Sequence, residues 1–326
     1  MPETTARSTA AAASLWRLAP ALGAVYLIWG STYLAIRFAI ETIPPFLMAG
    51  ARFLVAGVLL YVWARASGAA RPTLAQWRAT AAIGGFLLLG GNGGVVWAEQ
   101  HVPSGIAALL ITTEPLWIVL LDWLRPNGRR PGWRVAAGLL LGFAGTVLLV
   151  RPGLGGGVYP LGAIVLVLAS LSWAWGSLRS TWAPLPSSRI LTTGMQMLAG
   201  GALLLLVGLA TGEPARFALA EVSTRSLLAV LYLVVFGSLI AFSAYVWLLR
   251  EAPPALVATY AYVNPVVAVL LGWGLAGEPL TAGTLAAAAV IIAGVVVITT
   301  APRHPAARPL PAREVASASP EERAAA

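Results

Sequence analysis

The sequence repeats itself over the stretch from Val96 to Trp123 when it is shifted by 150 positions, the distance from Trp97 to Trp247. Two tryptophans and two prolines coincide at this one offset: Trp97 with Trp247, Trp123 with Trp273, Pro103 with Pro253 and Pro115 with Pro265. Tryptophan and proline are too uncommon in a chain rich in Leu, Ala and Val for these matches to arise by accident. The chain is therefore an internal duplication, and any fold that it adopts must contain two similar units.

The match extends in both directions with small slips in the offset. Trp29-Gly30-Ser31 falls on Trp175-Gly176-Ser177, and Ala144-Gly145 falls on Ala293-Gly294. The predicted parts of the chain are an N-terminal tail at 1–17, a first repeat at 18–150, a second repeat at 151–300 and a C-terminal tail at 301–326. We expect the C-terminal tail to be disordered, because it is rich in Pro, Ala, Arg and Glu and has no apolar face.

The composition is that of a membrane protein. Hydrophobic residues make up 59% of the 326 positions and charged residues 10%, whereas soluble domains carry about 25% charged residues. Apolar runs of about 20 residues, the length of a helix that crosses a bilayer, follow one another with short breaks. We count ten such runs: 18–40, 45–66, 77–98, 103–124, 133–150, 159–182, 189–210, 226–249, 254–276 and 280–300. The predicted fold is an all-α membrane protein with ten transmembrane helices.

Several residue types needed for common chemistries are absent or scarce. There is no cysteine, so the chain can form neither disulfides nor thiolate sites. All 21 basic residues are arginine, which excludes a P-loop lysine and a pyridoxal Schiff base. The two histidines, His101 and His304, both lie outside the apolar runs. We therefore predict that the protein is not an enzyme and has no cofactor and no metal site.

The arginines are distributed unevenly between the breaks. If successive breaks lie on alternate sides of the membrane, the two tails and the loops on their side carry sixteen arginines, and the opposite side carries only Arg37, Arg151, Arg216 and Arg225. The positive-inside rule then predicts that both termini are cytoplasmic. The net charge of +9 becomes a property of that face, where it suits anionic lipid. We expect no nucleic-acid partner and take a monomer as the working oligomeric state, which the sequence leaves open.

Each repeat contains five spans, an odd number, so the second repeat enters the membrane from the side opposite to the first. Two similar units in opposite orientations are related by a pseudo-two-fold axis in the membrane plane. Many secondary transporters use such inverted repeats for alternating access to a site near the midplane. Inverted duplication also occurs in channels, so it favours transport without specifying the transport mode.

Several motifs resemble those of a known family. The first span carries Trp29-Gly-Ser-Thr-Tyr33, the second carries Ala49-Gly-Ala-Arg-Phe53, and the fourth begins at a proline and contains Glu114-Pro115. With ten spans in two repeats, the chain resembles the EamA branch of the drug/metabolite transporter superfamily, and within it bacterial amino-acid exporters, including aromatic-amino-acid exporters of the YddG type. The resemblance implies a multi-pass protein of the bacterial inner membrane. It also covers Gly277-Glu278 in the last loop, to which we assign no role in transport.

Charged residues within spans are costly and usually face a cavity or a partner. Arg52 lies about 11 Å along the second span and Glu114 about 16 Å along the fourth, at 1.5 Å per residue. Arg52 is either a substrate ligand or a structural anchor bonded to carbonyls or to Glu114. Glu114 precedes Pro115, which loosens the helix, so this place suits a substrate or coupling site, or is simply a structural kink. The second repeat has Asn264-Pro265 at the matching place, so it lacks the carboxylate.

Aromatic residues, polar residues and glycines complete the candidate site. Aromatic side chains deep in a span either pack in the core or line a cavity, and the two readings are equally open. The predicted substrate-binding residues are Trp29, Ser31, Tyr33, Arg52, Asn92, Glu114, Trp117, Trp173, Trp175, Tyr260, Tyr262 and Asn264. The predicted hinge or gating residues are Pro115, Pro265, Gly90 and Gly91. Glycine-rich stretches of this kind serve equally well as close helix contacts.

The sequence thus predicts a secondary transporter that exports amino acids, aromatic or other neutral ones among them, or related small metabolites by alternating access. An exporter of lipophilic or quaternary cations coupled to protons is the alternative, with Glu114 as the neutralising group. A receptor or scaffold without flux is less favoured, because it has no need of an inverted duplication. A sugar-phosphate antiporter would need a basic cavity, and only Arg52 is available. Uniport and proton antiport are not distinguished.

Overall fold

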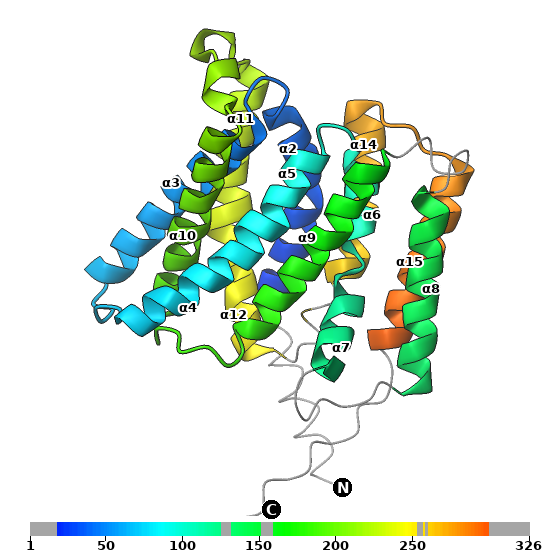
Figure 1. Cartoon of the computed structure of the whole chain (residues 1–326), viewed down its shortest axis with the longest axis horizontal. Coiled ribbons are helices and arrows are strands. Elements are labelled where there is room, and N and C mark those ends of the chain that lie inside the picture. The colour runs from blue at the N-terminus through cyan, green and yellow to red at the C-terminus, as the bar shows by residue number, and fades with distance from the viewer. Residues whose placement is uncertain (1–17, 125–131, 151–158, 253–256, 258–259, 300–326) are drawn as a thin grey trace, which may run out of the picture.

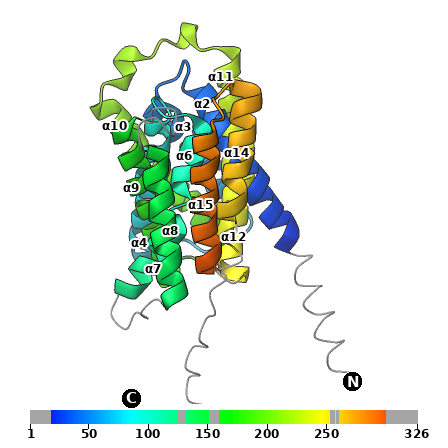
Figure 2. The same cartoon turned by 90° about the vertical axis from the view of Figure 1, so that its right-hand side faces the viewer.

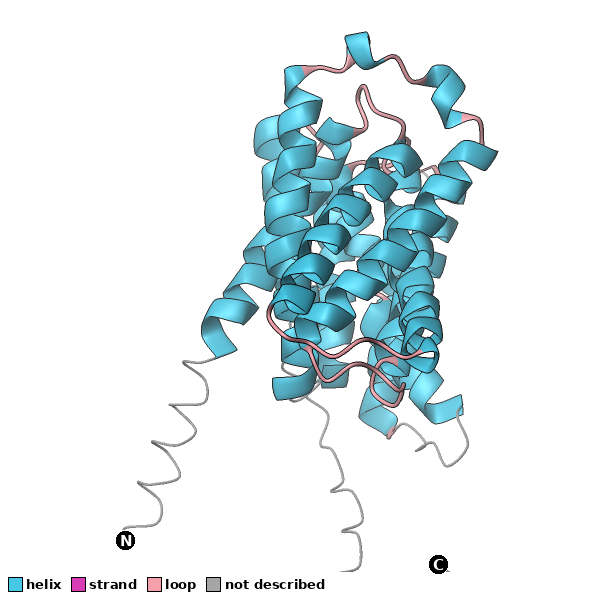
Figure 3. Cartoon of the chain, turned by 90° about the vertical axis from the view of Figure 1, so that its left-hand side faces the viewer, coloured by secondary structure: helices cyan, strands magenta, loops and turns pink. Residues whose placement is uncertain are grey.

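A computed structural model of the chain describes residues 18–124, 132–150, 159–252, 257 and 260–299. These residues form helices joined by loops, and none of them forms a strand (Figures 1 and 3), so the predicted all-α membrane fold is confirmed. The helices in the first half are η1 (Val25–Trp29), α2 (Gly30–Ala39), α3 (Pro45–Ala66), α4 (Leu74–Gly84), η2 (Gly85–Gly93), α5 (Gly94–Ala98), α6 (Ser104–Ile111), α7 (Glu114–Leu124) and α8 (Trp133–Val150). Those in the second half are α9 (Pro160–Arg179), α10 (Arg189–Ala210), η3 (Glu213–Arg216), η4 (Leu219–Glu221), α11 (Thr224–Tyr232), η5 (Leu233–Phe242), α12 (Ser243–Glu251), α14 (Tyr260–Ala276) and α15 (Ala282–Thr299).

Successive helices combine into long apolar spans. Seven described helices are long and apolar enough to cross a membrane: Leu18–Ala39, Pro45–Ala66, Leu74–Ala98, Ser104–Leu124, Pro160–Arg179, Arg189–Ala210 and Thr224–Glu251. Three shorter apolar helices, Trp133–Gly145, Val263–Ala276 and Ala282–Gly294, lie where the other predicted spans were placed. The membrane character is therefore established, and the count of ten spans stays a prediction.

Local chemistry explains where the helices begin. Pro44-Pro45 starts α3, since proline at the first helical position lacks only an N–H that would be unpaired anyway. The side chain of Thr73 accepts a hydrogen bond from Gln76 N, and the side chain of Gln76 accepts one from Thr73 N, which is a capping box at α4. The Ser188 hydroxyl accepts a hydrogen bond from Leu191 N and so caps α10.

Two spans contain π-helical segments at equivalent places in the two halves. These are η2 in the third span and η5 in the eighth, and a shorter segment, η1, lies in the first span. A π-helix is wider than an α-helix, is rarely long, and is often found at functional sites. All three segments contribute residues to the central cavity described below.

Equivalent helices of the two halves pack against each other in opposite directions. A Cβ atom on Gly57 of α3 would lie 2.8 Å from Leu198 N of α10, and one on Gly194 would lie 3.1 Å from Gly57 O. Gly50 precedes Gly57 in α3, and it faces Leu205, which follows Leu198 in α10. The two helices are therefore antiparallel. The pair α8 and α15 packs in the same way, with Gly145 against Ile291, and lies side by side in Figures 1 and 2. Glycine is required at Gly57 and Gly194, because a side chain would force the backbones apart.

The two ends of the helix bundle are called the upper and lower faces here, as they stand in Figure 1. The upper face holds the starts of α3, α6 and α11 and the end of α14. The lower face holds the starts of α4 and α10 and the ends of α7 and α12. Between the faces, the outer surface is apolar: Val55, Val58, Leu59 and Val62 form an exposed stripe on α3 at helical spacing. Such an exposed apolar stripe suits contact with lipid.

Candidate functional site

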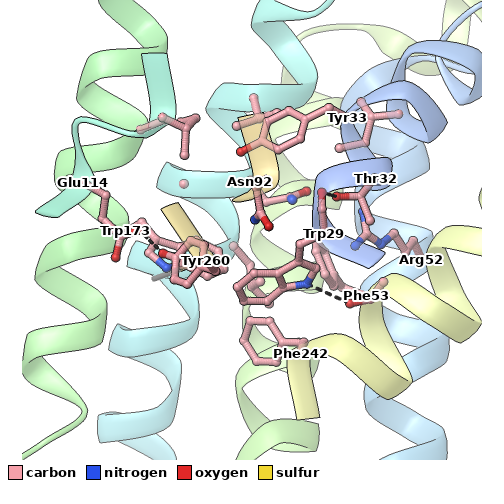
Figure 4. A pocket seen from close by; sticks show the side chains of 18 residues that line it. Trp29, Thr32, Tyr33, Arg52, Phe53, Asn92, Glu114, Trp173, Phe242 and Tyr260 are labelled. Atoms are coloured by element: carbon pink, nitrogen blue, oxygen red, sulfur yellow. Dashed lines mark hydrogen bonds between the residues drawn. The ribbon is translucent and has the colours of Figure 1, made fainter. Parts of the chain in front are cut away.

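The interior of the bundle contains a cavity of about 80 Å³ between the two halves. Its walls come from spans one to four of the first half and from α9, η5 and α14 of the second, as Figure 4 shows for the labelled side chains. The lining residues are Trp29, Thr32, Tyr33, Ile36, Arg52, Phe53, Leu88, Gly91, Asn92, Val95, Ile111, Glu114, Ala169, Trp173, Gly237, Phe242, Tyr260 and Asn264. We call this the central cavity.

Most of the predicted substrate-binding residues meet in the central cavity. From the predicted set, the lining includes Trp29, Tyr33, Arg52, Asn92, Glu114, Trp173, Tyr260 and Asn264, together with the predicted hinge residue Gly91. These residues are scattered over 236 positions of the sequence, from Trp29 to Asn264. Their convergence is a property of the fold.

Three predicted residues lie elsewhere, and a fourth lies outside the described side chains. Trp173 and Trp175 are two positions apart on α9 and so point to opposite sides of the helix, which places Trp175 on the surface against Phe86. The hydroxyl of Ser31 bonds to the Tyr232 hydroxyl at 2.6 Å, away from the cavity. Trp117 lies on α7 outside the lining, and the side chain of Tyr262 is not among those described.

Arg52 is the cationic group of the central cavity. It is 3% exposed, its Nε donates to Ser238 Oγ at 2.8 Å, and its guanidinium carbon lies 4.5 Å from the centre of the Phe53 ring. Its Nη1 atom has no hydrogen-bond partner among the described residues, and no described carboxylate forms an ion pair with it. The anchor is thus a serine hydroxyl of the second half, and the suggested bond to Glu114 is not formed. A buried guanidinium with a free donor is ready to bind an anionic group.

Glu114 is the anionic group of the cavity and stands at a break in the fourth span. The helix α6 ends at Ile111 and α7 starts at Glu114, so the interruption covers Thr112 and Thr113, just before Pro115. Both threonine hydroxyls donate to carbonyls of the preceding turn, which satisfies groups that the break sets free. The Glu114 Oε2 atom accepts a hydrogen bond from the hydroxyl of Tyr260, on α14 of the other half. In Figure 4, Glu114 and Arg52 lie on opposite sides of the aromatic rings.

Two amides add polar groups without partners. Asn92 lies on η2 and Asn264 lies on α14, one from each half. The Oδ1 atoms of both are buried and accept no hydrogen bond from any described group. Unsatisfied acceptors inside a protein are costly, so their presence in a cavity points to a ligand that supplies N–H donors.

Aromatic rings form the floor of the central cavity. Trp29 contacts Trp173 edge to face with centroids 5.6 Å apart, and contacts Tyr260 in the same way at 5.6 Å. The Nε1 atom of Trp29 donates to Gly237 O at 3.3 Å. Phe242 and Tyr245, which the sequence did not single out as ligands, complete this aromatic cluster. Their spacing of three on one span, which places both rings on one face of a helix, is the signal that could have found them.

The predicted hinge residues occupy tight places. A Cβ atom on Gly91 would lie 2.8 Å from the Trp173 ring, and one on Gly90 would collide with Ser172 Oγ. Both glycines therefore allow η2 to approach α9 closely, which is their structural role in this conformation. Pro265 lies inside α14 without ending it. Whether any of these positions moves stays a prediction.

The upper face carries carboxylates that join the halves, which the sequence did not reveal. Glu278, in the loop after α14, accepts hydrogen bonds from Ser104 N and Gly105 N at the start of α6, at 2.8 and 3.0 Å. Glu213, in the loop after α10, likewise accepts from Phe46 N and Leu47 N at the start of α3, at 3.1 and 2.8 Å. Each carboxylate thus fixes a helix start of the first half to a loop of the second half.

Glu99 lies directly after α5, outside the span and near Glu278. It is fully buried, and neither carboxylate oxygen accepts a hydrogen bond from the described residues. Burial raises the pKa of Glu99 well above its usual range, the nearby charge of Glu278 raises it further, and Arg37 lowers it in part. Arg37 donates to the backbone oxygen of Glu99 at 3.5 Å and lies 4.0 Å from Glu278. Glu99 is therefore favoured in its neutral form.

The fold and the central cavity define a multi-pass helical membrane protein with a polar, aromatic-lined chamber between two halves, as in small-molecule transporters. The profile of the "EamA-like transporter family" matches residues 19–151 and again residues 160–300. The chain therefore belongs to the EamA-like transporter family of the drug/metabolite transporter superfamily and is a membrane transporter.

Individual relatives agree with this assignment. The chain is 43% identical to the "Uncharacterized inner membrane transporter YedA" of Escherichia coli K12, over 92% of this chain and 96% of that protein. It is 29% identical to "Protein PecM" of Dickeya dadantii, over 81% and 88%. A solved crystal structure superposes with a TM-score of 0.61 over 88% of this chain and 97% of that one, at 24% identity, which shows the fold alone. These relatives' names state no substrate, so the finer resemblance to YddG-type exporters stays a prediction.

Proposed function

We propose that the protein exports amino acids with apolar side chains, aromatic ones among them, or related small metabolites across the bacterial inner membrane by alternating access. One observation carries the proposal: a buried guanidinium with a free donor faces an aromatic cavity that also holds unpartnered amide oxygens. Arg52 would bind the carboxylate of the substrate, and Asn92 and Asn264 would accept hydrogen bonds from its ammonium group. The rings of Trp29 and Trp173 would take the apolar side chain.

Alternating access is supported by the packing of the two halves. The antiparallel pair α3 and α10 and the antiparallel pair α8 and α15 are what an inverted repeat requires, with the central cavity between the halves. The cavity of about 80 Å³ is smaller than the roughly 300–1,000 Å³ of sites that hold drug-sized molecules. The central cavity must therefore widen before it can hold a substrate, which fits a site that changes between conformations.

Glu114 is the candidate coupling group. It is the carboxylate of the cavity, it stands at a helix break, and its partner Tyr260 belongs to the other half. A change in its protonation would weaken or strengthen a contact between the halves, which is how proton binding can bias a two-state transporter. The alternative function, export of lipophilic cations, rests on the same residue, because a carboxylate beside aromatic rings also suits a cation.

Reconstitution into liposomes tests these proposals. Labelled L-phenylalanine and L-leucine and a cationic dye are supplied with and without a pH gradient. We expect flux of the amino acids, and we expect Arg52→Gln to reduce it at least about tenfold, since a buried charge-assisted hydrogen bond contributes about 1.5–3 kcal/mol. Arg179→Gln, an exposed arginine at the end of α9, is the matched control and should leave flux unchanged.

The outcomes separate the alternatives. Flux of the dye alone would overturn the amino-acid proposal in favour of the cation exporter. Full dye flux in the Glu114→Gln protein would in turn exclude the proton-coupled cation-exporter mechanism, because that mechanism needs the carboxylate. Equal rates with and without the pH gradient would argue against proton coupling, and absence of flux for every compound would support a receptor or scaffold.

A further inference from the structure

A second, larger cavity lies near the lower face. Its volume is about 450 Å³, and it is bounded by the start of η2, by the loop between α9 and α10, and by α10 and α12. It is lined by Leu87, Ser180, Thr181, Ala183, Leu185, Pro186, Ser187, Thr192, Gln196, Tyr245, Val246, Leu249 and Arg250. We call it the lower cavity. Its size lies within the range of small-molecule sites, unlike the central cavity.

The lower cavity contains a buried acceptor without a partner. Gln196 on α10 is 2% exposed, and its Oε1 atom accepts no hydrogen bond from the described part of the chain. The sequence offset that aligns the halves places Gln196 opposite Arg52 of the first repeat. A buried amide oxygen that faces a cavity is suited to an N–H donor on a ligand.

Arg250 supplies the complementary donor at the mouth of the lower cavity. Its Nη atoms contact Pro186 O, Ser187 O and Thr192 Oγ1, each at 3.4 Å. These contacts are longer than the usual 2.7–3.2 Å, so a carboxylate would compete with them successfully. Thr192 and Gln196 are one turn apart on α10, about 6 Å along the axis. Arg250 contacts Thr192, and Gln196 lies one turn further on, so a carboxylate at Arg250 and an ammonium near Gln196 can belong to one α-amino acid.

The aromatic cluster separates the two cavities. Tyr245 lines the lower cavity, is 2% exposed, and lies 4.8 Å from the Trp29 ring and 5.9 Å from the Trp173 ring, both of which line the central cavity. The Tyr245 hydroxyl is held by Ser177 Oγ at 2.9 Å. A molecule in the lower cavity is therefore one ring away from the central cavity.

We propose that the lower cavity is a second binding site, which receives the carboxylate-bearing apolar molecule before it passes Tyr245 into the central cavity. Arg250 binds the carboxylate, Gln196 accepts from the ammonium group, and Leu185, Val246 and Leu249 contact the side chain. This inference rests on the proposed function for its ligand class. The second site differs from the central cavity in its polar groups, which are Gln196 on α10 and Arg250 on α12, both in the second half.

The absence of cysteine allows a direct test. Ser187→Cys places one thiol in the lining, and its rate of reaction with a polar maleimide is measured in the full-length protein with L-phenylalanine or phenethylamine. We expect L-phenylalanine at ten times its Kd to slow the reaction about tenfold, since only the free site reacts. Phenethylamine, which lacks the carboxylate, should leave the rate unchanged.

Second substitutions in the Ser187→Cys protein locate the site. Protection should persist with Arg52→Gln, which alters the central cavity, and should be lost with Arg250→Gln or with Gln196→Leu. Arg179→Gln is the control, because this arginine is on the same face but does not line the lower cavity. No protection, or protection that disappears with Arg52→Gln, overturns the second site. If liposomes show amino-acid flux but the thiol is not protected, only the second site is rejected. If the flux itself is missing, the proposed function is rejected.

Discussion

Two groups of buried polar side chains in this protein have different consequences. Those with partners, such as Glu213 and Glu278, hold helix starts in place. Those with free atoms, such as Arg52 and Gln196, face the two cavities. Because an unsatisfied buried group costs stability, the second group marks the places where a ligand gains most by binding.

Glu99 is unlike both groups, since it is buried, unpartnered and outside the two cavities. Its raised pKa means that the folded protein holds the proton more tightly than the unfolded chain. Stability is then highest at low pH and falls as the pH rises through the folded pKa. We expect Glu99→Gln to raise the unfolding free energy by about 1–3 kcal/mol at high pH, where the carboxylate of the unfolded wild-type chain is ionised.

Thermal unfolding in detergent at about pH 4 and about pH 8 checks this expectation. The variant and the wild type should unfold at similar temperatures at the lower pH and diverge at the higher one. Glu221→Gln, an exposed carboxylate on the same face, should change neither. A Glu99→Gln protein that is less stable at the higher pH would show that the carboxylate is satisfied and charged.

At the scale of helices, the upper face is tied across the two halves by two carboxylates. Each accepts two backbone N–H groups at a helix start, and those N–H groups have no partner within their own helix. Among the described residues of the lower face, Thr73 and Ser188 instead cap the starts of their own helices. This difference fits a conformation in which the upper face is closed and the larger cavity lies near the lower face.

Removing one of these caps should destabilise the protein. We expect Glu213→Ala and Glu278→Ala each to lower the unfolding free energy by about 1–3 kcal/mol, because buried N–H groups lose charge-assisted partners. Glu221→Ala, in the same loop as Glu213 but exposed, should stay within about 0.5 kcal/mol. Thermal unfolding of the three variants measures this. Equal melting temperatures for Glu213→Ala and Glu221→Ala would mean that the cap contributes nothing.

For the whole molecule, the predicted inverted repeat has a topological consequence that can be tested. Ser67, after the second span, and Thr211, after the seventh, are equivalent places in the two repeats and lie on opposite faces. In cells that carry either Ser67→Cys or Thr211→Cys, an impermeant maleimide should label only Thr211→Cys from outside. Ser67→Cys should react only after permeabilisation. Labelling of both from one side would exclude inverted repeats, and labelling of Ser67→Cys alone would reverse the orientation.

The sequence by itself determined the class of the protein and much of its framework. Span-length apolar runs and the offset of Trp and Pro pairs are local or periodic properties, so they indicate membrane helices and duplication without any knowledge of contacts. Charge inside a span is costly wherever the span lies, which is why Arg52 and Glu114 could be selected as candidates. Their surroundings could not be inferred in the same way.

Only the tertiary structure decided which residues meet. It joined Arg52 to Ser238 rather than to Glu114, turned Trp175 to the surface while Trp173 faces the cavity, and brought Tyr260 onto Glu114. It also revealed that Glu278, to which the sequence assigned no function in transport, caps the start of α6. Helix rotation and the pairing of distant spans decide these contacts. They depend on how side chains pack between helices, which an apolar sequence with few distinctive residues leaves undetermined.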